Sequence, residues 1–397
     1  MSFIMNIRSV AKYESKILVR SWFFRIFTLL AVVFLGFFNF AMMLMEDNFG
    51  LWFAKSVSSN IPYLNLLLLN TGQAVVAVFL SSEFLKRDKK LDTSEVFYVR
   101  PLSNAEYVVG KIWGNLRVFL FLNLLVLAIV LAFNFMASGV TVDLPAYLVY
   151  FFLISIPTLI FIIGLSIFLM LLLKNQALTF ILLLGYIGLT LFYIQDKFYY
   201  LFDYMVYNLP LFKSTIVGFS NLELILNHRA NYFFAGLGFI FFTIFLFKRL
   251  PNARRSHYPW LFLSFCMFLL MVTAGFRHVR SILWEGEMRA LYTSINNKYV
   301  YEPKMAIDYY DISVEQKSET IRSVVGMEGT ALAASEVFIF CLNPGLRVEE
   351  VKDGEKSLNF KREEQILAVD FGRKIEKGDT ISFSVSYEGR KIGRAHV

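Results

Sequence analysis

A charged segment, residues 81–114, separates two long apolar stretches of this 397-residue chain. Acidic and basic side chains alternate along it, with apolar and aromatic residues beside them. Such a mixture of signs suits a complementary protein surface better than a lipid surface, so the chemistry on offer is recognition. A solvated, positively biased turn is the alternative. The candidate contact residues are Glu83, Arg87, Asp92, Glu95, Arg100, Glu106, Tyr107 and Lys111.

Nucleotide- and zinc-binding signatures do not accompany this segment. A phosphate-binding loop requires G-x-x-x-x-G-K-[ST], but Ala105 stands where the first glycine is needed and Ile112 where the hydroxyl is needed. A zinc peptidase requires H-E-x-x-H, and none of the four histidines is followed by Glu. We therefore expect no enzymatic activity, cofactor or metal in this chain, and histidines at the surface or the membrane interface. These histidines are His228, His257, His278 and His396.

The charged segment contains its own helix start. Pro101 disfavours a helix that arrives from upstream. Ser103 and Glu106 have the spacing of a capping box, in which each side chain accepts a hydrogen bond from the backbone amide of the other residue. The sequence therefore predicts a helix that begins near Asn104 and continues into the next apolar stretch.

The composition indicates that this helix and its neighbours lie in lipid. The chain is 57% hydrophobic and 17% aromatic, which is more apolar surface than a soluble domain of this length can bury. Apolar windows of about twenty residues, the length that crosses a bilayer core, predict a membrane all-α bundle of about seven transmembrane helices. The expected spans are residues 26–45, 61–80, 118–136, 148–173, 177–194, 233–247 and 260–276.

Basic residues set the expected orientation. The connections at one end of the spans hold far more Lys and Arg than those at the other, which places the N-terminus in the cytoplasm and residues after 276 outside. Because the net charge of +8 is spread over span ends, we expect a lipid membrane and not nucleic acid as partner. Residues 1–25 are predicted to form an amphipathic helix on anionic headgroups, or else an ordinary basic flank. Its bases are Arg8, Lys12, Lys16 and Arg20.

Polar residues interrupt some of the spans. Buried amides in lipid need partners, so those of the second and third spans are predicted to bond between helices, or to line a translocation path or dimer seam. Pro157 is expected to kink the fourth span. The aromatic loop of residues 195–231 is expected to form short helices on the outer leaflet, or a substrate gate. The candidate amides are Asn65, Asn70, Gln73 and Asn123.

The composition after residue 276 is that of a soluble protein. We expect a stem over residues 281–308, followed by strands that alternate polar and apolar residues. Asp353–Gly354 between two such runs is typical of a hairpin. The sequence therefore predicts an extracytoplasmic all-β sandwich over residues 309–391.

Residues 1–255 resemble the permeases of type 2 ABC transporters, which have a basic amphipathic N-terminus, six core spans and a first cytoplasmic loop of this kind. The matching loop positions are Glu83, Thr93, Glu95, Arg100, Pro101, Ser103, Glu106, Tyr107, Gly110 and Lys111. The resemblance implies a permease core at 26–255, a seventh helix at 256–280, and docking of the loop on a cytoplasmic ABC ATPase that binds ATP. It further implies a homodimer or heterodimer of permeases in the bacterial inner membrane.

Residues 309–390 are similar to the N-terminal β domain of zinc aminopeptidases of the aminopeptidase-N type. The similarity rests on the strand pattern, the segment LNPGLRVEEV and the closing SVSYEG. Residues 392–397, IGRAHV, resemble a translated sequencing adapter, so we expect a truncated chain whose catalytic part, with its zinc, is missing.

Two functions are expected from these patterns. The first is the membrane-spanning permease subunit of an ATP-driven ABC exporter, which couples ATP hydrolysis on a separate subunit to transport. The alternative is a membrane-anchored zinc aminopeptidase whose catalytic domain lies outside this fragment. A purely structural membrane scaffold is a third reading.

Overall fold

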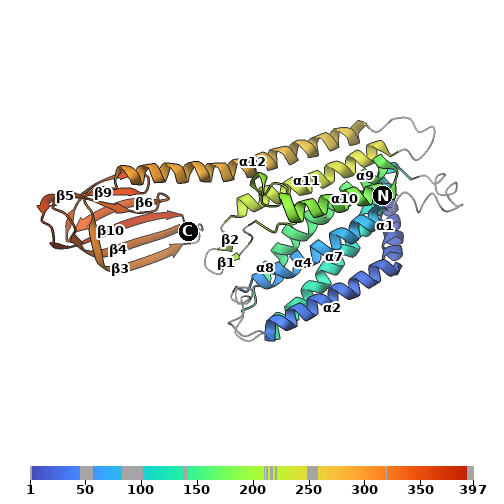
Figure 1. Ribbon diagram of the computed structural model, residues 1–397, viewed down its shortest axis with the longest axis horizontal. Coiled ribbons are helices and arrows are strands. Elements are labelled where there is room, and N and C mark those ends of the chain that lie inside the picture. Colours follow the sequence, from blue (N-terminus) through green and yellow to red (C-terminus); the bar gives the residue numbers. More distant parts are fainter. Residues whose placement is uncertain are drawn as a thin grey trace. The chain divides into compact units, whose positions relative to one another are not determined.

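The computed structural model (Figure 1) describes residues 2–44, 57–82, 102–136, 141–209, 211, 213–214, 218–219, 221–247, 258–317 and 320–390. It divides into two compact units, Met1–Arg280 and Ser281–Val397. Among the described residues, seven helices are long and apolar enough to cross a membrane. The coarse layout that the sequence predicted, seven apolar helices followed by β-structure, is confirmed.

The first unit is built mainly from helices. In chain order its elements are α1 (Ser2–Arg20), α2 (Trp22–Leu44), α4 (Asn60–Ser82), α7 (Asn104–Met136), α8 (Leu144–Tyr150), the π-helix η1 (Phe151–Ser155), α9 (Ile156–Leu173), α10 (Gln176–Leu189), the π-helix η2 (Thr190–Ile194), the 3₁₀ turn η3 (Phe198–Tyr200), the strands β1 (Lys213–Ser214) and β2 (Gly218–Phe219), and α11 (Leu222–Leu246). Helix α12 (Tyr258–Lys298) begins in this unit and ends in the second.

The sixth span begins earlier than its expected range. Helix α11 begins at Leu222, well before residue 233. Its first turns contain His228 and Arg229, which lower the hydropathy of this stretch but are buried with partners in the folded unit. Hydropathy therefore detected only the second half of the helix.

Glycines bring some of these helices into backbone contact. A Cβ atom on Gly164 of α9 would lie 2.6 Å from the carbonyl oxygen of Gly236 on α11, and one on Gly238 would lie 2.8 Å from the ring of Phe268. Only glycine allows such close approach. Gly185 and Gly188 of α10 have no atom within 4 Å of a Cβ position.

Helix α1 packs along the first turns of α7 (Figure 1). A Cβ atom on Gly110 would lie 2.7 Å from Val10, and one on Gly114 would lie 2.7 Å from Glu14. The helix ends at Arg20, and residues 22–25 of the range predicted for an amphipathic helix belong to α2. Four bases of α1 are exposed, and apolar residues such as Ile4 and Tyr13 are exposed beside them. The exposed bases are Arg8, Lys12, Lys16 and Arg20.

The second unit contains the end of α12 and antiparallel strands. These strands are β3 (Met305–Lys317), β4 (Thr320–Ala331), β5 (Ser335–Cys341), β6 (Leu346–Asp353), β7 (Lys356–Ser357), β8 (Asn359–Glu363), β9 (Ile366–Ile375) and β10 (Thr380–Arg390). They form two sheets with the orders β3-β4-β10-β6-β7 and β5-β9-β8. Apolar residues of both sheets share one core, in which Phe371 of β9 and Phe383 of β10 pack edge to face at 5.5 Å. The two sheets therefore form a sandwich.

Local signals set the details of this unit. The hairpin predicted at Asp353–Gly354 joins β6 to β7, and Gly354 has the positive φ of 62° that such a turn requires. The first strand begins at Met305, shortly before the expected boundary at residue 309.

At the end of α12, Lys298 Nζ lies 2.8 Å from an oxygen of Glu363, which holds the stem on β8. Hydrogen bonds from Lys298 and Tyr299 lower the pKa of Glu363.

Candidate functional site

The first candidate site is a joint between α1 and the start of α7. The amide of Ser103 donates to Glu106 Oε2 at 2.6 Å, and the amide of Glu106 donates to Ser103 Oγ at 3.1 Å. The predicted capping box is therefore confirmed, and α7 begins at Asn104. Glu106 Oε1 also accepts a hydrogen bond from Asn6 of α1 at 2.9 Å. The cap of one helix thus holds a second helix about a hundred residues away in sequence.

A buried ion pair lies one turn further along α7. Lys111 Nζ is 3.1 Å from Glu14 Oε1 of α1, and the two side chains are 1% and 5% exposed. The Lys111 ammonium also lies 4.9 Å from the centre of the Tyr107 ring, which stacks on Phe247 at the end of α11. Lys111 and Tyr107 therefore join α7 to α1 and α11.

The structure distributes the candidate contact residues in two ways. Glu106, Tyr107 and Lys111 come together in the joint and are buried, so they do not form an exposed contact surface. Arg117 also belongs to the joint, although no role was predicted for it. It donates hydrogen bonds to Ser15 Oγ and to the carbonyl of Ala11, the latter at 2.8 Å. The sequence feature that could have indicated this role is a basic residue directly before a predicted span. Glu83, Arg87, Asp92, Glu95 and Arg100 lie outside the described residues.

The amides of the second and third spans form a closed ring of hydrogen bonds. Asn123 of α7 donates to Gln73 of α4 at 2.9 Å, and Gln73 donates to Asn70 Oδ1 at 3.0 Å. Ser155 of η1 donates to Asn123 Oδ1 at 2.8 Å and lies 3.2 Å from Asn70 Nδ2. All four side chains are buried, so the ring satisfies them without water. Asn65 is separate from this ring and exchanges hydrogen bonds with Asn39 of α2.

The π-helix η1 directly precedes Pro157, where a kink was expected. Proline has no amide hydrogen, so the carbonyl of Leu153, four residues earlier, loses its helical donor. Arg229 of α11 replaces that donor: its Nε lies 2.6 Å from Leu153 O, and its Nη2 lies 3.2 Å from Ile154 O. The same side chain donates to Thr158 Oγ1 at 2.8 Å and to the carbonyl of Tyr204 at 2.9 Å. Arg229 is only 2% exposed, and sequence analysis gave it no role.

The second candidate site, the end segment (residues 199–213), lies at the other end of the helical unit from the joint (Figure 1). Of the short helices expected for residues 195–231, the structure has the 3₁₀ turn η3, and the described residues between η3 and the hairpin of β1 and β2 form irregular chain. Side chains from several helices donate to its carbonyl oxygens. The donors are His278 for Tyr199, His228 for Tyr200, Tyr232 for Leu201, Thr158 and Arg229 for Tyr204, Tyr63 for Val206, Tyr150 for Leu211 and Ser59 for Lys213.

Two of these donors correct an expectation. His228 and His278 were predicted at the surface or membrane interface, but both are fully buried. A carbonyl oxygen can only accept, so the Nε2 atom of each ring carries the hydrogen that bonds to the end segment. The prediction failed because the carbonyls that satisfy these rings come from a distant part of the chain. His257 and His396 lie outside the described residues.

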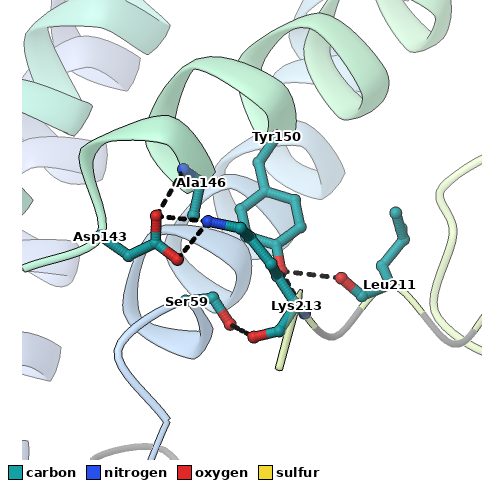
Figure 2. Close-up of polar contacts among 6 residues, drawn as sticks. All are labelled: Ser59, Asp143, Ala146, Tyr150, Leu211 and Lys213. Atoms are coloured by element: carbon teal, nitrogen blue, oxygen red, sulfur yellow. Dashed lines mark hydrogen bonds and ion pairs between the residues drawn. The ribbon is translucent and has the colours of Figure 1, made fainter. Parts of the chain in front are cut away.

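Figure 2 shows how the far end of this segment is fixed. Lys213 Nζ lies 2.6 Å from both carboxylate oxygens of Asp143, and Asp143 also accepts from the amide of Ala146 as the N-cap of α8. Tyr150 donates to the carbonyl of Leu211 at 2.7 Å and accepts from the amide of Lys213 at 3.2 Å. An ion pair and a tyrosine therefore attach β1 to α8.

Asp203 gives the end segment a buried carboxyl group. Its Oδ2 accepts from the amide of Asn208 at 2.8 Å, and the side chain is fully buried. Burial raises the pKa of Asp203, while backbone amides and the Arg229 charge act in the opposite direction. Within the part of the chain that the structure describes, no group of three or more His, Cys, Asp or Glu side chains could hold a metal ion.

No protein-family model matches the chain, and no curated protein matches it significantly.

Proposed function

We propose that this chain is the membrane-spanning permease subunit of an ATP-driven ABC exporter. A separate cytoplasmic subunit would hydrolyse ATP, and this chain would move the substrate across the bacterial inner membrane. The observation that carries the proposal is the joint between α1 and α7, because the charged segment leads directly into it. A force on that segment would reach α1, α7 and α11 together through the cap of Glu106 and the Glu14–Lys111 ion pair.

The candidate residues divide into two roles in this proposal. Those of residues 83–100 contact the ATPase, and their mixed charges fit a complementary protein surface. Glu106, Tyr107 and Lys111 are positioning residues, since they are buried and hold α7 to its neighbours. ATP-driven closure of the ATPases would then tilt α7 and the helices attached to it.

The end segment supports a resting state that is closed on the outer side. Asp203, Tyr204, Met205, Val206 and Leu211 are each 0% exposed, so this stretch is packed into the end of the helical unit that the proposal places on the outer side. Its release would follow movement of the joint, as in alternating access. In the same proposal the protein works as a homodimer or heterodimer of permeases.

Co-purification of the tagged full-length protein from native membranes tests the proposal. We expect an ATPase in near-equal amount, and we expect the double variant Arg87→Glu/Arg100→Glu to lose it while still inserting in the membrane. Lys377→Glu, a charge reversal at an exposed position in the second unit, is the matched control and should retain the ATPase. Failure to recover any ATPase with the wild-type protein would contradict the proposal.

A membrane-anchored zinc aminopeptidase is the second candidate. The antiparallel sandwich of the second unit favours it, since the sequence of that unit resembles an aminopeptidase N-terminal domain. Zinc-dependent peptidase activity of the full-length protein, together with the absence of an ATPase partner, would support this candidate over the exporter.

A further inference from the structure

The chain adopts an unusual backbone where it leaves the fifth span. Phe198, Tyr199 and Tyr200 have φ angles of 52°, 59° and 61°. Residues other than glycine rarely occupy this left-handed region, and successive ones do so only where surrounding contacts impose it. We call residues 198–202 the left-handed turn. Contacts with surrounding side chains must stabilise its backbone conformation.

Three buried side chains impose this backbone. His278 of α12 donates to the carbonyl of Tyr199 at 2.8 Å, His228 of α11 donates to that of Tyr200 at 3.0 Å, and Tyr232 donates to that of Leu201 at 2.6 Å. The two histidines are 0% exposed and Tyr232 is 4% exposed. Three successive carbonyls of the left-handed turn therefore point into the helical unit.

The aromatic side chains of the turn are exposed instead. Phe198 is 62% exposed, Tyr199 46%, and Phe202 39%. Phe198 and Phe202 pack edge to face at 5.5 Å, so they form one surface. Phe192 of η2, shortly before the turn in sequence, is 88% exposed.

We propose that the left-handed turn is an anchor in the interfacial layer of the membrane, with lipid as its partner. Phenylalanine and tyrosine favour the layer where hydrocarbon meets headgroups. The turn also follows closely on the apolar helix that ends at Ile194, which places it at the level where a span ends.

The hydrogen bonds of the turn meet a requirement of a lipid environment, because backbone polar groups in lipid must be satisfied within the protein. His278, His228 and Tyr232 satisfy three carbonyls in succession, while the rings of Phe198, Tyr199 and Phe202 are exposed. These three residues are therefore positioning residues for the anchor. The inference requires a membrane-embedded bundle and does not depend on the exporter proposal.

Spin labels measure the environment of the turn directly. In a full-length protein with Cys266 and Cys341 replaced by serine, labels are placed at Phe198→Cys and Phe202→Cys. Asp196→Cys serves as the water control and Phe37→Cys, on the exposed face of α2, as the lipid control. The samples are vesicles of phosphatidylethanolamine and phosphatidylglycerol, and collision rates with oxygen and with a water-soluble nickel chelate are compared.

We expect the labels at 198 and 202 to collide more often with oxygen than with nickel. Their ratio of oxygen to nickel collisions should lie between the ratios of the two controls and closer to the ratio at Phe37. Nickel collisions equal to those at Asp196 would place the turn in water and overturn the proposal. Low collision rates with both reagents would indicate a protein partner and would overturn it as well.

A second set of variants tests the positioning residues. The double variant His228→Ala/His278→Ala should shift the label at 198 toward the behaviour of Asp196, because two carbonyls lose their donors. His228→Gln/His278→Gln keeps an N–H donor in each side chain and should keep the lipid-like signal. Tyr232→Phe removes one hydrogen bond with little change of volume and should produce a smaller shift, which remains measurable even if the alanine variant does not fold. An unchanged signal in Tyr232→Phe and in the folded alanine variant would overturn the positioning role.

Discussion

The two ends of the helical unit are held by different chemistry. At the joint of α1 and α7, an ion pair and side-chain hydrogen bonds join two regular helices that glycines bring into contact. In the end segment, side chains bond the carbonyls of a chain with almost no regular structure. A helix keeps its own hydrogen bonds when one side chain is lost, whereas an irregular segment is left with bare carbonyls. The joint should therefore move as one body, and the end segment should be the part that can open.

The largest effect on stability is expected for a substitution of Arg229, which donates to a carbonyl of the end segment. The substitution Arg229→Met removes the donors for the carbonyls of Leu153 and Ile154, and one donor for Tyr204. Each buried unsatisfied group costs about 1–3 kcal/mol, and Tyr204 keeps Thr158 as a donor, so we expect the two carbonyls of η1 that lose Arg229 to lower the free energy of unfolding by about 2–6 kcal/mol. Unfolding by SDS in detergent micelles measures it. Arg8→Met, at an exposed position of α1, is the control and should change stability by less than about 0.5 kcal/mol; a similar small effect at Arg229 would contradict the comparison.

The joint should respond strongly to loss of a single charge. Lys111→Met removes the cation beside the buried Glu14 carboxylate, and breaking a buried ion pair in this way costs about 3 kcal/mol or more. The double variant Glu14→Gln/Lys111→Met should be less destabilised than the sum of the two single variants. The same unfolding assay, arranged as a double-mutant cycle, gives the coupling. Additive effects would show that the pair does not hold α1 on α7.

A smaller effect is expected at the ion pair that attaches β1 to α8. Asp143→Asn keeps a side-chain oxygen for the N-cap of α8 but removes the charge opposite Lys213. Because the pair is partly exposed, we expect a loss of roughly 1 kcal/mol that shrinks at high salt. Unfolding measurements at low and high sodium chloride concentration give both the loss of stability and its dependence on salt. Lys213→Met should reproduce the effect, and a salt-independent loss would point to a damaged cap.

The smallest effect concerns pH. Burial raises the pKa of Asp203 in the folded protein above its ordinary value. The stability linked to its protonated form is therefore fully present below the ordinary pKa of about 3.9 and is lost as the pH rises through the raised value. Asp203→Asn should flatten this part of the stability–pH curve and change stability at neutral pH by less than about 1 kcal/mol. A steeper curve in the variant would contradict this assignment.

Features that depend on neighbours in sequence were predictable. The capping box of Ser103 and Glu106 and the hairpin at Gly354 each require residues within one turn, and the structure has both where they were expected. Apolar windows likewise located the seven long apolar helices found among the described residues, since crossing lipid depends on length and composition.

Features that depend on distant partners were not predictable. Lys111 was expected on a contact surface, and only the position of Glu14 on another helix explains why it is buried. Arg229 has no role in its own helix, because its function is to replace the donor that Pro157 lacks on a neighbouring one.

The sequence by itself determined the helices, their order and the change to β-structure, because hydropathy, caps and turns act within a few residues. Only the tertiary structure decided which polar side chains are buried. Burying a charge or a ring nitrogen is favourable only when a partner from elsewhere in the chain satisfies it, as the carbonyls of the end segment satisfy His228 and Arg229.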